Sequence, residues 1–155
     1  MSPIDLGTAT PDELAAIDPS ELVEAVQAMS DRELKGVMEG ANRGAIIESI
    51  FTRMPQLFRP ERAGATSATT HWSLTGRPQG ASDDWTVRVA DGVCTVLRGH
   101  EGSSTLALTM APFDFIKLIT KTGNPVMMFM TGRLKARGDV ALAASLAGWF
   151  DVPSR

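Results

Sequence analysis

The chain has 155 residues and a formal net charge of −3 at pH 7, from 15 basic and 18 acidic side chains. Its 43% apolar and 21% charged residues lie near the globular average, which excludes a disordered or fibrous chain. The acidic balance disfavours nucleic acid as a partner, because phosphate binding needs a concentrated basic face. Cys94 is the single cysteine, which excludes an internal disulfide and a multi-cysteine metal site.

The sequence lacks the run of about 18 to 20 apolar residues that a membrane-spanning helix needs. Its first residues, Met-Ser-Pro-Ile-Asp-Leu, lack the basic start and apolar core of a secretory signal. We therefore expect a cytoplasmic protein.

Residues 1–38 are predicted to form an N-terminal helical extension, because three helix-start signatures occur there. In each, a polar residue that caps the helix is followed by glutamate three positions later, the spacing of a capping box. The three pairs are Thr10 with Glu13, Asp18 with Glu21, and Ser30 with Glu33. Apolar residues then recur at helical spacing, which predicts short amphipathic helices.

A further helix is predicted over residues 46–54, where apolar side chains recur at positions typical of one helix face. This pattern ends between Pro55 and Pro60, since proline removes a backbone donor and disfavours helix in the residue before it.

From residue 65 the apolar residues alternate with polar ones, which predicts strands. We expect four antiparallel strands at residues 70–75, 85–89, 93–98 and 105–109. Asp91-Gly92 joins the second strand to the third, because this dipeptide favours the positive φ angles of a two-residue hairpin. One face of the sheet is apolar and needs a cover of helices.

Helices on both sides of the strands in sequence are expected to supply that cover. A helix is predicted at 113–120, an apolar run follows at 126–130, a short strand at 133–137 and an amphipathic helix at 140–150, with Asp139 as its N-cap. The order of elements predicts an α+β domain with a five-stranded, mostly antiparallel sheet and helices packed on one face.

One stretch is specific enough to suggest a family. Phe129 to Asp139 reads Phe-Met-Thr-Gly-Arg-Leu-Lys-Ala-Arg-Gly-Asp. It resembles the signature of the sterol carrier protein 2 family of lipid-transfer domains, with Arg133 and Arg137 in place of the commoner lysine and valine. The resemblance covers roughly residues 40–150, so we assign residues 39–155 to this domain.

The resemblance implies an apolar tunnel between the helices and the sheet, in which relatives hold fatty acids, acyl-CoA, phospholipids or sterols. It implies no catalytic residue and no cofactor. We therefore expect non-enzymatic binding, and intracellular transfer, of an apolar ligand. The expected tunnel wall comprises Val87, Val89, Leu106, Leu108, Phe115, Ile116, Ile119, Met127, Phe129, Met130, Leu134, Leu142, Leu146, Trp149 and Phe150.

The run Met127 to Met130 favours a cavity, because methionine adapts to apolar ligands of varied shape. The alternative is that these residues are ordinary core. Since four consecutive side chains do not all face one interior, at least one of them is expected at the surface.

Other side chains offer little chemistry. Cys94 lies within an apolar strand, where cysteine is usually a small buried hydrophobe, and a thiol nucleophile with His71 or His100 is disfavoured. Asp83 and Asp84 are adjacent in a predicted turn and are expected to be solvated.

Arg133, Lys135 and Arg137 alternate along the last predicted strand and therefore share one face, to which Arg88 and Arg98 could add. This face is either a solvated outer surface or a transient contact for anionic membranes or for a CoA pyrophosphate.

An alternative function is that of an interaction module. The N-terminal helices would then dock a partner enzyme of lipid or steroid metabolism, or a second copy in a homodimer. The contact stripe would comprise Leu14, Ile17, Leu22, Val26, Met29 and Leu34. The simpler interpretation is that these helices cover the sheet or the mouth of the tunnel.

Overall fold

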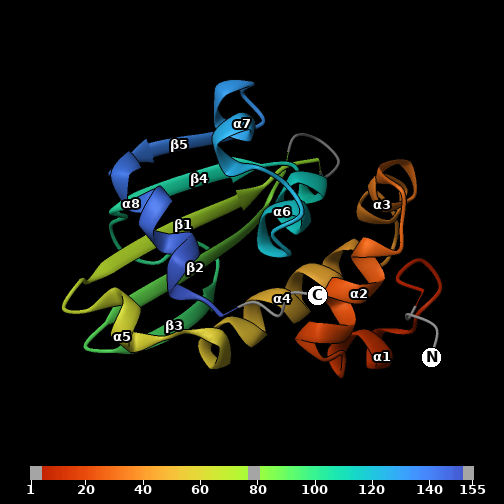
Figure 1. Cartoon of the computed structure of the whole chain (residues 1–155), viewed down its shortest axis with the longest axis horizontal. Coiled ribbons are helices and arrows are strands. Elements are labelled where there is room, and N and C mark those ends of the chain that lie inside the picture. Colours follow the sequence, from red (N-terminus) through yellow and green to blue (C-terminus); the bar gives the residue numbers. More distant parts are fainter. Residues whose placement is uncertain (1–4, 77–80, 152–155) are drawn as a thin grey trace.

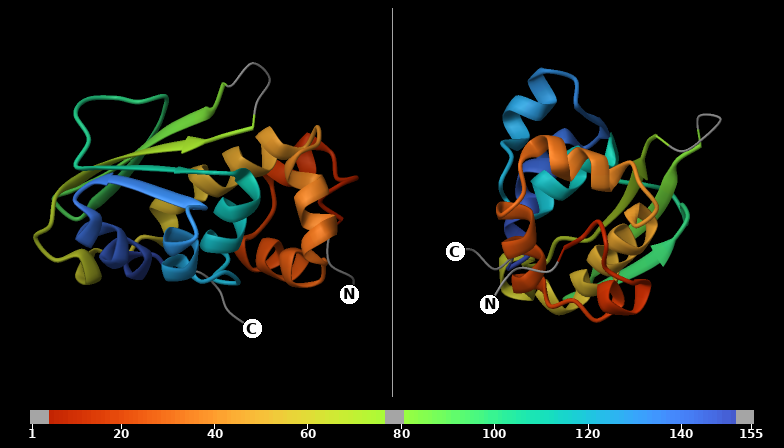
Figure 2. Two further views of the ribbon diagram at one scale, coloured as in Figure 1. Left: turned by 90° about the horizontal axis from the view of Figure 1, so that it is seen from above. Right: turned by 90° about the vertical axis from the view of Figure 1, so that its right-hand side faces the viewer.

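The structure is a computed structural model that describes residues 5–76 and 81–151. It has the predicted α+β architecture: one five-stranded sheet, with the later helices over one of its faces and the N-terminal helices beyond one end of the sheet (Figures 1 and 2). Strands β1 (Ala68–Leu74), β2 (Asp83–Ala90), β3 (Val93–Arg98), β4 (Leu106–Met110) and β5 (Leu134–Gly138) lie in the order β3-β2-β1-β4-β5.

The expectation of four antiparallel strands is wrong at β4. That strand pairs in parallel with β1, whereas β1–β2, β2–β3 and β4–β5 are antiparallel. Alternation of apolar residues indicates which face of a strand is buried, but it does not select the neighbour. β4 pairs with the edge of β1 opposite to β2, because the segment that joins β3 to β4 crosses the sheet.

Residues 99–105 make that crossing over the outer face, opposite the helices (Figure 2). Thr86 Oγ1 donates to the carbonyl of Gly99 at 2.7 Å and accepts from the backbone N–H of Glu101 at 2.9 Å. The backbone N–H of Thr105 then donates to the carbonyl of Thr69 at 2.7 Å. The crossing thereby buries Thr86 completely, although it lies on the outer face.

The β2–β3 hairpin forms as predicted. Asp91 and Gly92 have φ angles of 53° and 73°, the left-handed conformation that this two-residue turn requires.

Among the described residues, five helices and one 3₁₀ turn lie on the inner side of the sheet. They are α4 (Arg43–Leu57), α5 (Pro60–Ala63), α6 (Pro112–Ile119), α7 (Pro125–Met130), α8 (Val140–Leu146) and the 3₁₀ turn Ala147–Trp149. α4 ends at Leu57, between Pro55 and Pro60 as predicted, and Pro55 lies inside its last turn.

The N-terminal segment forms α1 (Pro11–Ala15), α2 (Pro19–Gln27) and α3 (Asp31–Met38). Each begins with the predicted capping box, in which the cap side chain and the glutamate three residues later bond each other's backbone. In α3, the hydrogen bonds from the backbone and side chain of Ser30 hold the pKa of Glu33 below its ordinary value of 4.5.

An aromatic cluster fills the centre of the layer between helices and sheet. Phe51 of α4 stacks on Trp85 of β2 and on Phe115 of α6, with ring centroids 4.7 and 5.1 Å apart. Trp72 of β1 meets both phenylalanines edge-on, at 5.8 and 5.7 Å. Both tryptophans are buried. Packing of this kind ties α4 and α6 to the sheet.

Candidate ligand-binding site

Most of the predicted tunnel wall lies inside the molecule. Eleven of its fifteen residues are buried, on the inner face of the sheet and on the helices that cover it, and Ile119 is half-buried. The buried members are Val87, Val89, Leu106, Leu108, Phe115, Ile116, Leu134, Leu142, Leu146, Trp149 and Phe150. They belong to one apolar cluster with the aromatic side chains of Phe51, Trp72 and Trp85.

The other three predicted wall residues lie at the surface. Met127, Phe129 and Met130 of α7 are 54%, 47% and 73% exposed. Their neighbour Met128 is the α7 methionine that points inward, since only 4% of it is exposed. Asn124 caps α7 and sets its orientation, because its Oδ1 accepts from the backbone N–H groups of Val126 and Met127.

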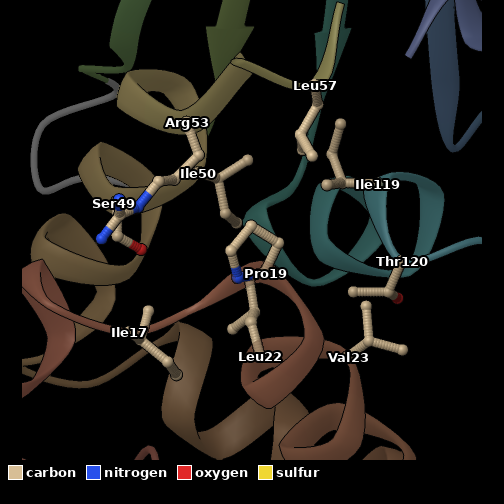
Figure 3. A pocket seen from close by; sticks show the side chains of 10 residues that line it. All are labelled: Ile17, Pro19, Leu22, Val23, Ser49, Ile50, Arg53, Leu57, Ile119 and Thr120. Atoms are coloured by element: carbon tan, nitrogen blue, oxygen red, sulfur yellow. The ribbon is translucent and has the colours of Figure 1, made fainter. Parts of the chain in front are cut away.

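An apolar hollow lies where α2, α4 and α6 meet (Figure 3). Its volume is about 30 Å³, close to that of one water molecule. The lining residues are Ile17, Pro19, Leu22, Val23, Ser49, Ile50, Arg53, Leu57, Ile119 and Thr120. Ile119 therefore belongs both to this hollow and to the predicted tunnel wall.

The polar side chains around the hollow are already bonded to backbone. Ser49 Oγ donates to the carbonyl of Ile46 at 2.7 Å, and Thr120 Oγ1 donates to that of Ile116 at 2.7 Å. Arg53 donates to the carbonyl of Ala15 at 3.1 Å. The wall thus offers hydrocarbon to a ligand.

Sequence reasoning missed the part of the hollow that α2 and α4 contribute. Ile17 and Leu22 belong to the stripe that the alternative function offers to an external partner, but the structure buries that stripe within the chain, as the simpler interpretation predicts. Leu14, Ile17, Leu22, Val26 and Leu34 are 7% exposed or less, and Met29 packs against the same core. The helical spacing of these residues indicated a buried face, but not the element that covers it.

Other candidate groups have structural roles. Burial of the Cys94 thiol raises its pKa to about 11, so it stays protonated at neutral pH. Asp83 was expected to be solvated, but it accepts two hydrogen bonds from the buried Arg43, which joins α4 to the start of β2. His71 stacks on His100 on the outer face, with ring centroids 4.5 Å apart.

Within the described ranges, no three His, Cys, Asp or Glu side chains are grouped to hold a metal ion. Nor does that part of the chain contain a helix long and apolar enough to cross a membrane.

Comparison with known proteins identifies the family. The sequence model of the SCP-2 sterol transfer family matches residues 47–151, which is more than half of the chain. The chain belongs to this family. The match contains α4 from its second turn and every strand, so the SCP-2 domain includes the sheet and the helices α5–α8.

Two curated relatives illustrate the similarity. Hydroxysteroid dehydrogenase-like protein 2 of Xenopus tropicalis is 29% identical over 101 residues, 64% of this chain and 24% of that protein. Sterol carrier protein 2 of Homo sapiens is 36% identical over 69 residues, 44% of this chain and 13% of that protein. The chain therefore spans about a quarter or less of these relatives.

Solved structures share the fold. Sterol carrier protein 2 like 2 from Aedes aegypti has a TM-score of 0.54 at 23% identity, and the match covers 68% of this chain and 94% of that one. The sec-alkylsulfatase Pisa1 from Pseudomonas sp. has a TM-score of 0.64 at 15% identity, over 94% of this chain and 25% of that one. The likeness to Pisa1 extends over the N-terminal helices as well as the SCP-2 domain.

Proposed function

We propose that this protein binds one apolar ligand without chemical change and holds it between the helices and the inner face of the sheet. Fatty acids, acyl-CoA, phospholipids and sterols are the candidate classes. The observation that carries the proposal is the hydrocarbon wall of the hollow between α2, α4 and α6, whose hydroxyls and guanidinium are bonded to backbone. Membership in the SCP-2 family supports the same class of ligand.

Uptake requires the structure to open. A lipid chain needs a site of a few hundred Å³, whereas the hollow has about 30 Å³. We therefore propose the hollow as the entrance and the predicted tunnel wall as the final site, with Ile119 at their junction. The driving force is apolar burial, worth about 25 cal/mol for each Å² removed from water.

The first experiment is native mass spectrometry of the purified protein, followed by organic extraction and lipid analysis. The proposal predicts a co-purifying lipid at near-stoichiometric occupancy, or a gain in mass after incubation with acyl chains, acyl-CoA or sterols. A protein that stays free of ligand under all these conditions contradicts it.

Variants then separate entrance from interior. Ile119→Trp places bulk in the hollow and is expected to slow uptake of a fluorescent fatty acid at least about tenfold, because a closed entrance acts on the rate. Ala136→Phe places bulk beside Leu108 on the inner face of the sheet and is expected to lower the occupancy at equilibrium.

Val93→Trp is the matched control, because Val93 is 59% exposed on the edge strand β3. It is expected to leave both rate and occupancy unchanged. If Ile119→Trp has no effect on the rate while Ala136→Phe lowers the occupancy, the interior site stands and the entrance is elsewhere. If neither variant changes binding, the proposed site is wrong.

A further inference from the structure

Helix α7 exposes an unusual amount of apolar surface. Val126, Met127, Phe129 and Met130 are 64%, 54%, 47% and 73% exposed. They are four of the six large apolar side chains that the described part of the chain exposes, and all four lie within one six-residue helix. Single exposed apolar residues are common on soluble proteins, but a cluster of this kind marks a contact with another apolar body.

The helix is held firmly while it exposes these residues. Asn124 caps its first turn, Met128 is buried, and the backbone N–H of Arg133 donates to the carbonyl of Met128 at 2.8 Å. α7 packs against the edge strand β5 and projects beyond it. It is the topmost element in Figure 1 and in the right-hand view of Figure 2. It therefore presents a preformed apolar projection.

The sequence segment that contains α7 is opposite in charge to the rest of the chain. Residues 115–138 contain five lysines and arginines and no carboxylate. All 18 carboxylates and the remaining 10 basic residues lie elsewhere, so that remainder carries a formal charge of −8 (10 minus 18). A positive segment on an acidic protein interacts with anionic surfaces through a local field.

These cations lie on both flanks of α7. Lys135 and Arg137 are exposed on β5, and neither pairs with a carboxylate among the described residues. On the other flank, Lys117 and Arg133 line a hollow of about 180 Å³ together with Asp31, Phe113 and Met127. The Arg133 guanidinium lies 5.8 Å from the centroid of the Phe113 ring, and the Lys117 ammonium 6.0 Å from it.

We propose that α7 is the element by which this protein docks on anionic lipid bilayers. Val126, Phe129 and Met130 would enter the boundary between headgroups and acyl chains, where apolar side chains gain burial. The flanking cations would contact the anionic headgroups. Lys117 and Arg133, each already beside a carboxylate, would contribute less than Lys135 and Arg137.

Charge decides between a bilayer and a second copy of the chain. A two-fold dimer through this patch would bring the same surface of each copy together, and so two clusters of cations. An anionic bilayer is instead complementary in both respects, since it offers negative charge above hydrocarbon. Docking rests on the patch alone, and it extends the proposed function by giving the carrier a place to exchange its ligand.

The test is flotation of the full chain with phosphatidylcholine vesicles that contain about 30% phosphatidylglycerol, compared with phosphatidylcholine alone. We expect binding to the anionic vesicles, weakened when salt rises from about 0.05 to about 0.5 M because the Debye length shortens. Equal binding to both vesicles, or none to the anionic ones, overturns the proposal.

Variants locate the contact. Phe129→Ser with Met130→Ser is expected to weaken binding at least about tenfold, whereas Val93→Ser, at an exposed apolar position on β3, leaves it unchanged. Arg137→Glu is expected to weaken it about fivefold or more, and Arg62→Glu on α5 much less. If the double serine variant binds like the parent, α7 is not the docking element.

Light scattering distinguishes the remaining outcome. If the parent chain is a dimer that the double serine variant converts to a monomer, and neither binds vesicles, the patch is a contact between copies and the bilayer proposal fails. Flotation reports docking whether or not the interior holds a ligand, and native mass spectrometry reports the ligand, so a failure of docking is separate from a failure of the proposed ligand binding.

Discussion

The N-terminal helices α1–α3 and the helix α7 are both short and rich in apolar residues, yet they place them differently. Leu14, Leu22 and Leu34 of the N-terminal helices are 7% exposed or less, whereas Val126 and Met130 of α7 are 64% and 73% exposed. The first group is part of the common core, and the second faces solvent at the sheet edge.

The difference follows from side-chain distribution. In α1–α3 acidic and polar residues separate the apolar ones, so one face is buried and the other is hydrated. α7 reads Pro-Val-Met-Met-Phe-Met and has no polar side chain, so burial of Met128 on one side leaves the others in water. An apolar helix at an edge exposes residues that a central position would bury.

The largest expected effect separates these two regions by stability. Leu14→Ala removes a fully buried side chain and should lower the free energy of unfolding by about 2–5 kcal/mol. Met130→Ala should change it by about 0.5 kcal/mol or less. Chemical denaturation measures both changes, provided that the slope of the unfolding free energy against denaturant concentration stays the same in each variant. Equal losses would show that α7 is as much a part of the core as α1.

A smaller effect is expected at the helix caps. Ser30→Ala breaks the capping box of α3 and should cost about 1 kcal/mol, whereas Ser145→Ala, at an exposed position in α8, should change stability little. The bonds from Ser30 lower the pKa of Glu33. The stabilisation that ionised Glu33 adds to the folded state is therefore present above pH 4.5 and is lost as pH falls through the lowered pKa. Unfolding at pH 7 and pH 3 tests this, and an equal loss at both would contradict it.

At α7 the cap should act locally. Asn124→Ala removes the acceptor for two backbone N–H groups and should speed hydrogen exchange of Val126 and Met127 about tenfold. Global stability should fall less than in Ser30→Ala, because opening of α7 exposes little additional apolar surface. If the free energy of global unfolding falls by more than in Ser30→Ala, α7 is coupled to the core and does not differ from α1–α3 in this respect.

The smallest effect concerns an ion pair between α3 and α6, the helix that precedes α7. Lys117 Nζ of α6 lies 3.0 Å from Asp31 Oδ1 of α3, whose side chain is 73% exposed. A double-mutant cycle with Asp31→Asn and Lys117→Met should give a coupling of about 0.5 kcal/mol or less, because water screens such a pair. A larger coupling would mean that this pair helps to fasten α3 to α6.

Local features of the fold followed from short stretches of sequence. The three capping boxes, the Asp91-Gly92 turn and the inward alternation of β1 all formed as predicted, because each depends on residues within a few positions of one another. The Phe129–Asp139 stretch was enough to predict the family that residues 47–151 confirm.

The prediction that the basic residues of the last strand share one face, with Arg98 added to it, is only partly right. Lys135 and Arg137 share the outer face of β5, whereas Arg133 lies before that strand and pairs with Asp114. Arg98 is in register with Trp85, stacks on its ring and pairs with Glu48 of α4, so it does not extend the basic face. The sheet register, which brings together residues far apart in sequence, decided these positions.

By itself the sequence determined most of the elements and the five-stranded α+β class, because propensity, capping and apolar periodicity are local, and the Phe129–Asp139 stretch indicated the family by its resemblance to a known signature. The tertiary structure alone decided that β4 lies parallel to β1, that the N-terminal stripe is covered by the protein itself, and that Met128 turns inward while Met127, Phe129 and Met130 remain exposed. Burial depends on which surface a distant segment brings into contact, and no short window of sequence contains that surface.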